Sequence, residues 1–178
     1  PSRSSGSSSA PPNTSPTVAL WAAVREGKAP VFVNTNSSAA ILHADAILAK
    51  HPKTKVALIA DGPNVFNTLD KLDSKRYTVI LPPSIDRVPN SANRMNVAKL
   101  LADKGVNVAF SLSLGQSDFR AQQSTPLFGA AMLIRSGLDR QATIRSLTIE
   151  PAKLIGMDKK VGSIEAGKQA NLIVFGED

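Results

Sequence analysis

The sequence predicts an α/β protein built around a parallel β-sheet, and three observations support this. Short apolar segments that fit buried strands alternate with amphipathic segments that fit helices. The chain is 42% apolar with only one Trp and one Tyr, and this aliphatic bias is typical of parallel strands covered by helices. Its length of 178 residues is sufficient for one domain with a buried core.

The strand and helix segments follow one another along most of the chain. Order begins at Thr17, which we expect to cap a short helix over Val18–Glu26. The expected strands are Pro30–Asn34, Lys55–Ala60, Tyr77–Leu81 and Val106–Ser111. The expected helices are Ser37–Lys50, Asn64–Leu72, Ala92–Lys104, Pro126–Ser136, Asp139–Leu147 and Glu150–Ile155. This alternation predicts βαβ units, in either an open doubly wound sheet or half of an eight-stranded barrel.

Composition limits the other possibilities. Residues 1–16 are rich in Ser and Pro, so we expect a disordered linker there, and because residue 1 is Pro we expect that an upstream region was removed. The chain has no Cys, which excludes disulfides and thiolate metal sites. Its net charge is +7, but the basic residues are scattered, so we expect no nucleic-acid partner. No apolar run approaches the roughly 18 residues of a membrane span.

The C-terminal region carries the most specific motif. Two expected strands, Gly162–Ile164 and Ala170–Phe175, are joined by Glu165–Lys168 and follow the last helix. Residues Ser146–Phe175 closely resemble the C-terminal signature of the amidohydrolase superfamily, particularly its imidazolonepropionase-like and dihydroorotase-like members. The matching residues are Thr148, Pro151, Ala152, Leu154, Gly156, Gly162–Lys168 and Ala170–Val174.

The resemblance implies a fold and a domain division. Residues 17–157 correspond to the C-terminal half of a TIM-type (β/α) barrel, with the four expected strands as barrel strands five to eight. Residues 158–178 correspond to a C-terminal hairpin of the family's small β-sandwich. The partner implied for this chain is therefore the missing N-terminal half of the barrel, or another chain. Four parallel strands cut from a barrel leave two unpaired edges, which favour such pairing.

The resemblance also implies a metal-dependent site. In the family, one or two divalent metals of the zinc type activate a water at the carboxyl ends of the barrel strands. Here Asn34 and Asp61 stand where the family has His after strands five and six, and Ser113 stands where it has Asp after strand eight. Only Asp61 remains as a metal ligand, so metal binding is doubtful. Loop residues Asp118 and Arg120 are further candidates for contacting substrate.

The two histidines and the loop after the third strand carry weaker expectations. We expect His43 and His51 to lie on a helix face and at a helix end, because the family's ligands lie at strand ends. The loop Pro82–Ser91 could contribute substrate contacts or be a solvated loop.

Three functional hypotheses follow. The first is part of an amidohydrolase that cleaves non-peptide carbon–nitrogen bonds of a small molecule with metal-activated water, although this chain alone is expected to be inactive. The second is a degenerate, metal-free member with a binding or scaffolding role. The third is a self-sufficient doubly wound binding domain, which needs a Gly-rich phosphate loop that Asp61–Pro63 does not provide.

Overall fold

The computed structural model describes residues 15–112 and 127–174. Its main sheet contains four parallel strands that pair in chain order, so each strand lies beside the next one along the sequence. These strands are β1 (Val31–Asn34), β2 (Val56–Ile59), β3 (Tyr77–Leu81) and β6 (Asn107–Phe110). The predicted parallel α/β sheet is therefore confirmed, and all four strands lie within the predicted segments.

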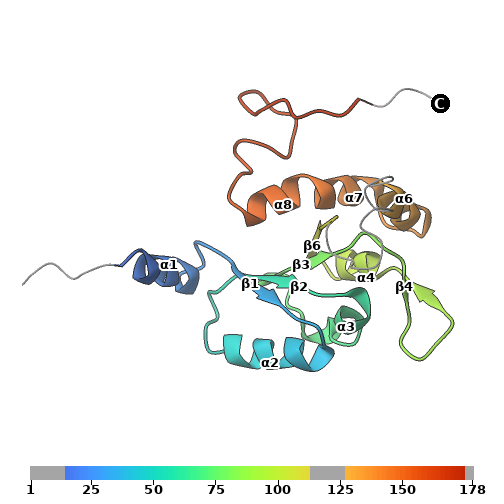
Figure 1. Cartoon of the computed structure of the whole chain (residues 1–178), viewed down its shortest axis with the longest axis horizontal. Coiled ribbons are helices and arrows are strands. Elements are labelled where there is room, and N and C mark those ends of the chain that lie inside the picture. Colours follow the sequence, from blue (N-terminus) through green and yellow to red (C-terminus); the bar gives the residue numbers. More distant parts are fainter. Residues whose placement is uncertain (1–14, 113–126, 175–178) are drawn as a thin grey trace, which may run out of the picture.

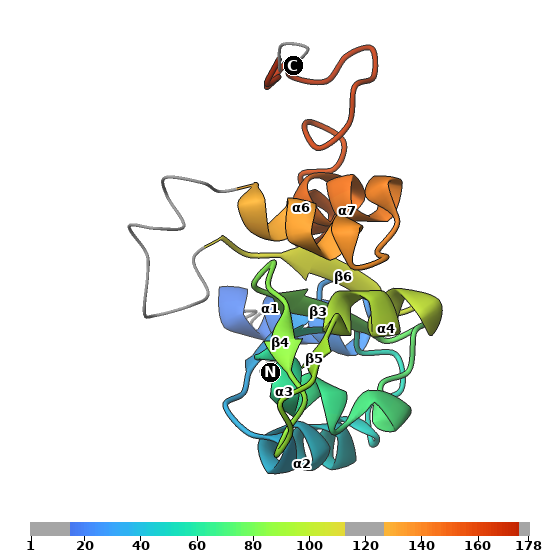
Figure 2. The same ribbon diagram turned by 90° about the vertical axis from the view of Figure 1, so that its right-hand side faces the viewer.

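Helices follow the strands as predicted. They are α1 (Pro16–Arg25), α2 (Ser38–Leu48), α3 (Gly62–Phe66), a 3₁₀ turn (Leu69–Lys71), α4 (Val97–Asp103), α6 (Phe128–Arg135), α7 (Arg140–Leu147) and α8 (Ile149–Leu154). In Figure 2, α2 lies below the strands, α4 beside them, and α6 and α7 above β6. The helices thus form an arc around the sheet.

The hydrophobic core occupies one face of the sheet. Side chains alternate along each strand, and Leu58, Val79 and Val108, which lie side by side in register, all belong to the core. Helices α2, α4 and α6 contribute Ile41, Leu101 and Leu133, which are at most 1% exposed, to the same cluster.

The opposite face of the sheet is less covered. Phe32 on β1 is 49% exposed, and Ile59 and Ile80 are only half-buried. Only one face of the sheet is therefore fully covered by helices.

Residues 86–95 correct the prediction of a helix beginning at Ala92. They contain a two-stranded antiparallel hairpin, β4 (Asp86–Arg87) and β5 (Arg94–Met95). The turn includes Asn90, whose φ of 55° is tolerated by Asn better than by most residues. Helix α4 starts only after Asn96, whose side chain accepts a hydrogen bond from the Lys99 backbone N–H. This cap satisfies a donor at the first turn and so fixes the helix start.

Two other helices begin or end differently from the prediction. Helix α1 starts at Pro16, inside the predicted linker, and Ser15 rather than Thr17 precedes it. Proline is favoured at a first helical position because its missing N–H needs no partner there. The predicted helix Asn64–Leu72 is a short α3 followed by a separate 3₁₀ turn. The break coincides with Thr68, whose hydroxyl donates to the carbonyls of the preceding turn.

The predicted C-terminal hairpin is wrong as far as the structure describes it. Residues 161–174 contain the expected turn, in which the Lys168 N–H donates to the Glu165 carbonyl, but they form no strand. Ile164 and Val174 are 87% and 90% exposed. A strand needs a neighbouring strand to satisfy its backbone groups, and no described strand pairs with these residues. Figure 1 shows the segment extending away from the helices.

Candidate functional site

The carboxyl ends of the four parallel strands lie along one edge of the sheet, called here the carboxyl edge. Side chains on the loops that leave this edge are brought together because parallel strands all end on the same side. Asn34 is the last residue of β1, and Asp61 follows β2 by two residues. Ser113, Asp118 and Arg120, which were predicted for the same edge, lie outside the described residues.

Hydrogen bonds tie together the loops that follow β1 and β2. The Ser38 N–H donates to the Asn64 side-chain oxygen over 3.0 Å, and the Ser38 hydroxyl donates to the same oxygen over 3.1 Å. The Thr35 N–H donates to the Ile59 carbonyl over 2.9 Å. These bonds hold the N-termini of α2 and α3 against each other. They leave the Asn34 side chain exposed at the end of its strand.

Asp61 acts as the N-terminal cap of α3. Its Oδ1 accepts a hydrogen bond from the Asn64 backbone N–H over 3.0 Å, which satisfies a donor that the short helix leaves free. Asp61 is itself exposed. Its second carboxylate oxygen has no hydrogen bond in the part of the chain described, so Asp61 combines a capping role with one uncommitted oxygen.

Asp86 is a second carboxylate at this edge, and it was not singled out from the sequence. It lies on β4 and packs directly over Gly62, where a Cβ atom would lie 2.0 Å from its Oδ2. Only glycine at position 62 allows this approach. The sequence placed Asp86 in the loop Pro82–Ser91, but nothing in the spacing distinguished it, because its position depends on the path of the loop.

The surroundings of Asp86 favour its protonated form. Burial raises the pKa of this carboxyl to about 6, and the negative charge of Asp61 acts in the same direction. A hydrogen bond with Ser84 opposes the increase. Neither Asp61 nor Asp86 makes an ion pair within residues 15–112 and 127–174. Among the described residues, the carboxyl edge thus holds two neighbouring carboxyl groups that form no ion pair with a cation.

The histidines are on the surface. His43 lies within α2 and His51 follows that helix, and both are exposed. The prediction that they occupy a helix face and a helix end is confirmed. Within the described ranges, no three His, Cys, Asp or Glu residues are grouped so as to hold a metal ion. The described residues therefore do not form a complete metal site by themselves, and Asp61 as a metal ligand stays a prediction.

Comparison with known proteins identifies the family. The model of the amidohydrolase family matches residues 34–177, and the chain belongs to this family. It is 35% identical over 81 residues to a 5-methylthioadenosine/S-adenosylhomocysteine deaminase of Teredinibacter turnerae, a match that covers 42% of this chain and 18% of that protein. The chain therefore spans only a small part of that relative.

A solved structure shows the same fold. An amidohydrolase from Thermotoga maritima superposes with a TM-score of 0.61 at 21% identity, covering 86% of this chain and 39% of that protein. Amidohydrolases generally use a divalent metal, so the incomplete set of ligands at the carboxyl edge bears directly on function. No helix in the described ranges is long and apolar enough to cross a membrane.

Proposed function

We propose that this chain forms the C-terminal half of an amidohydrolase barrel that hydrolyses a non-peptide carbon–nitrogen bond of a small molecule. The observation that carries this proposal is the Asp61–Asp86 carboxyl pair at the carboxyl edge, where (β/α) barrels bear their active sites. Family membership and the deaminase relative support a carbon–nitrogen hydrolase.

Barrel closure is part of the proposal. The sheet ends in β1 on one side and β6 on the other, and no described strand pairs with their outer edges. Phe32 on the less covered face is 49% exposed. Four further strands would pair with both edges and bury this face. The partner is therefore the N-terminal half of the barrel or a second chain that supplies equivalent strands.

Asp86 is suited to moving a proton in this reaction. Hydrolysis adds a water oxygen to the carbon and releases the nitrogen as an amine or ammonia, so one proton leaves the water and one reaches the nitrogen. A carboxyl whose pKa lies at about 6 can exchange a proton near neutral pH. Burial is the main cause of that raised pKa, the charge of Asp61 adds to it, and Asp61 also caps the start of α3. A metal would supply Lewis-acid activation of the water, but the described residues do not complete its ligand set.

A second candidate is a metal-free member of the family with a binding or scaffolding role. The observation that favours it is the pair of side chains at the ends of β1 and β2. Asn34 provides an amide, which is a weaker ligand than imidazole. Asp61 already uses one oxygen to cap α3. The described residues of the carboxyl edge are thus polar but include no grouped set of metal ligands.

The deciding experiment measures metal content and turnover of the full-length protein. The substrate panel contains cyclic amides and adenine nucleosides, the latter because of the deaminase relative. We expect one or more bound divalent metals and release of amine or ammonia. Asp86→Asn should lower kcat/KM by about 100-fold or more, as loss of a proton-transfer group does. Asp70→Asn, which changes an exposed carboxylate paired with Lys104, is the matched control.

The possible outcomes separate the two candidates. A protein without metal and without turnover on the whole panel supports the binding or scaffolding role and contradicts the hydrolase. If the protein turns over a substrate and Asp86→Asn does not change kcat/KM, the hydrolase hypothesis stands but Asp86 has no role in proton transfer. Asp61→Asn is informative as well, because Asn caps helices as effectively as Asp, so a loss of activity reports on the carboxylate charge.

A further inference from the structure

A cavity of about 270 Å³ lies at the opposite edge of the sheet, called here the amino edge. It is bordered by the residues that lead into β1, β2, β3 and β6, and α8 covers it. Lys55 precedes β2 and Asp61 follows it, six residues further along an extended chain. At roughly 3.3 Å per residue, these two positions are about 20 Å apart. The cavity is therefore separate from the carboxyl edge.

The lining of the cavity is strongly basic. Five cations contribute to it, and they come from separate segments: Lys28, Lys55, Lys75, Arg76 and Lys153. The carboxylate among the lining residues is that of Glu150. Cations gathered around a cavity repel one another, and those without a negative partner leave a net positive charge in it.

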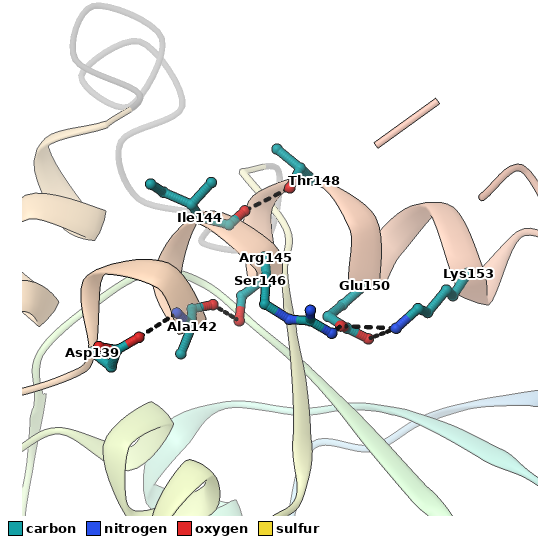
Figure 3. A network of polar contacts seen from close by, with 8 residues as sticks. All are labelled: Asp139, Ala142, Ile144, Arg145, Ser146, Thr148, Glu150 and Lys153. Carbon is teal, nitrogen blue, oxygen red and sulfur yellow. Dashed lines mark hydrogen bonds and ion pairs between the residues drawn. The ribbon is translucent and has the colours of Figure 1, made fainter. Parts of the chain in front are cut away.

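Two of these cations are already paired. Lys28 Nζ lies 2.6 Å from the Glu26 carboxylate. Lys153 Nζ lies 3.1 Å from Glu150, whose side chain is only 8% exposed. Figure 3 shows that Arg145 also reaches this carboxylate, over 2.7 Å. Glu150 is thus held by two cations and does not neutralise the rest of the cavity.

The other three cations have donors left over. Lys55 and Lys75 make no ion pair within residues 15–112 and 127–174. Arg76 donates through its terminal nitrogen to the carbonyls of Leu48 and His51, and its Nε is buried without a hydrogen-bond partner. The donors available at the cavity are therefore the unpaired ammonium groups of Lys55 and Lys75, and the Arg76 guanidinium adds positive charge at its border.

We propose that the amino-edge cavity binds a small phosphate-type anion, either free phosphate or the phosphate group of a small metabolite. The ammonium groups of Lys55 and Lys75 provide charge and hydrogen-bond donors, the Arg76 guanidinium adds positive charge, and the hydroxyl-bearing residues Ser74 and Thr78 line the same cavity. Phosphate presents several acceptor oxygens to such a set at once. The volume lies just below the range of pockets for drug-sized ligands, which fits a phosphate group with few further atoms.

The test uses the full-length protein and inorganic phosphate as the probe, at constant ionic strength held with sodium chloride. Titration calorimetry gives the affinity. Amide chemical shifts of the isotopically labelled chain give the location. We expect the amides of Lys55 and of Ser74–Thr78 to shift with saturation. Lys55→Gln combined with Lys75→Gln should weaken binding about 10-fold or more, because each charged hydrogen bond contributes substantially.

The control is Lys50→Gln combined with Lys71→Gln, which removes the same charge from lysines that do not line the cavity. This pair should bind phosphate like the wild type. An equal loss in both double variants overturns the proposal, because the effect is then one of net charge. Shifts confined to other residues overturn it as well, whatever the variants do.

Two further ligands distinguish the sources of the anion. Glycerol phosphate that binds at least as tightly as inorganic phosphate indicates a phosphorylated metabolite, and weaker binding indicates free phosphate. Acetate that binds as tightly as phosphate contradicts the phosphate class. Because this site lies away from the carboxyl edge, its absence leaves the proposed hydrolase untouched, and failure of the hydrolase leaves this site untouched.

Discussion

The two edges of the sheet differ in whether a buried carboxylate has a cation beside it. At the amino edge, the Glu150 carboxylate is nearly buried and two cations neutralise it. At the carboxyl edge, Asp86 is half-buried and its charged neighbour is another carboxylate, Asp61. A buried charge without a cation is costly, so, among the described residues, the Asp86 carboxylate destabilises the fold where the paired Glu150 carboxylate does not. Such costs are common where a side chain serves chemistry rather than folding.

The first prediction concerns the support of the carboxyl edge. Gly129 lies in α6, where a Cβ atom would approach the Pro83 carbonyl oxygen to 1.9 Å. Pro83 belongs to the loop that carries Asp86. Alanine normally stabilises a helix relative to glycine by about 1 kcal/mol, but here backbone must move. We expect Gly129→Ala to lower the free energy of unfolding by about 2–3 kcal/mol, measured by urea denaturation at pH 7.

The control for Gly129 uses the same helix. Ala131 is an exposed position of α6, so Ala131→Gly should lose only about 1 kcal/mol through helix propensity. A Gly129→Ala variant as stable as the wild type would show that the close contact between α6 and Pro83 does not constrain the loop. In that case α6 would not hold the loop that carries Asp86 in position.

The second prediction tests the compensated edge. Glu150→Gln keeps the shape of the side chain but removes the charge held by Arg145 and Lys153. Those cations remain 58% and 47% exposed, so water can solvate them after the change. We therefore expect a loss of about 1–2 kcal/mol in the free energy of unfolding, below the cost of breaking a fully buried pair. Urea denaturation at pH 7 measures it.

An exposed ion pair provides the matched control for Glu150. Glu165 pairs with Lys168 but is 62% exposed, and surface pairs contribute little. Glu165→Gln should change stability by less than about 0.5 kcal/mol. Equal losses of unfolding free energy in Glu150→Gln and Glu165→Gln would mean that burial does not increase the contribution of the Glu150 ion pairs to stability.

Sequence patterns predicted the strands better than the loops between them. The strand Tyr77–Leu81 was predicted with its observed bounds, because a run of β-branched, aromatic and aliphatic residues lies between Arg76 and Pro82. The hairpin at Asp86–Met95 was missed, since two-residue strands carry no measurable period. The C-terminal strands failed for another reason: residues 161–174 have the right alternation, but a strand forms only with a partner.

The candidate site was predictable only in part. Asp61 was placed correctly at a strand end, because the apolar segment Lys55–Ala60 predicts a strand that ends directly before it. Its role as a cap was not predicted, because the expected helix began only at Asn64, and its neighbour Asp86 could not be predicted from spacing. Their meeting depends on Gly62 admitting the carboxylate of a residue far along the chain, which is a property of the folded protein. The basic cavity was equally hidden, because its cations come from separate segments.

The third and smallest prediction uses pH to test the uncompensated edge. The pKa of Asp86 is raised from 3.8 in the reference state to about 6 in the fold, so the folded chain binds its proton more tightly than the unfolded chain. This contribution to stability is fully present below pH 3.8 and is lost as the pH rises through 6. Asp86→Asn lacks the charge at every pH. It should match the wild type at pH 4 and exceed it by about 1 kcal/mol at pH 8, after allowance for solvent screening.

Asp61→Asn tests whether the charge of Asp61 contributes to the raised pKa of Asp86. Asn keeps the cap on α3 but removes the charge that helps to raise the pKa of Asp86. In that background, the change in stability caused by Asp86→Asn should shrink, and its midpoint should fall below pH 6. Burial remains as the larger cause of the raised pKa, so the change should not vanish. A pH profile of unfolding free energies that is the same with and without the Asp61 charge would mean that the two carboxyl groups do not interact, and the carboxyl edge would hold two independent acids rather than a pair.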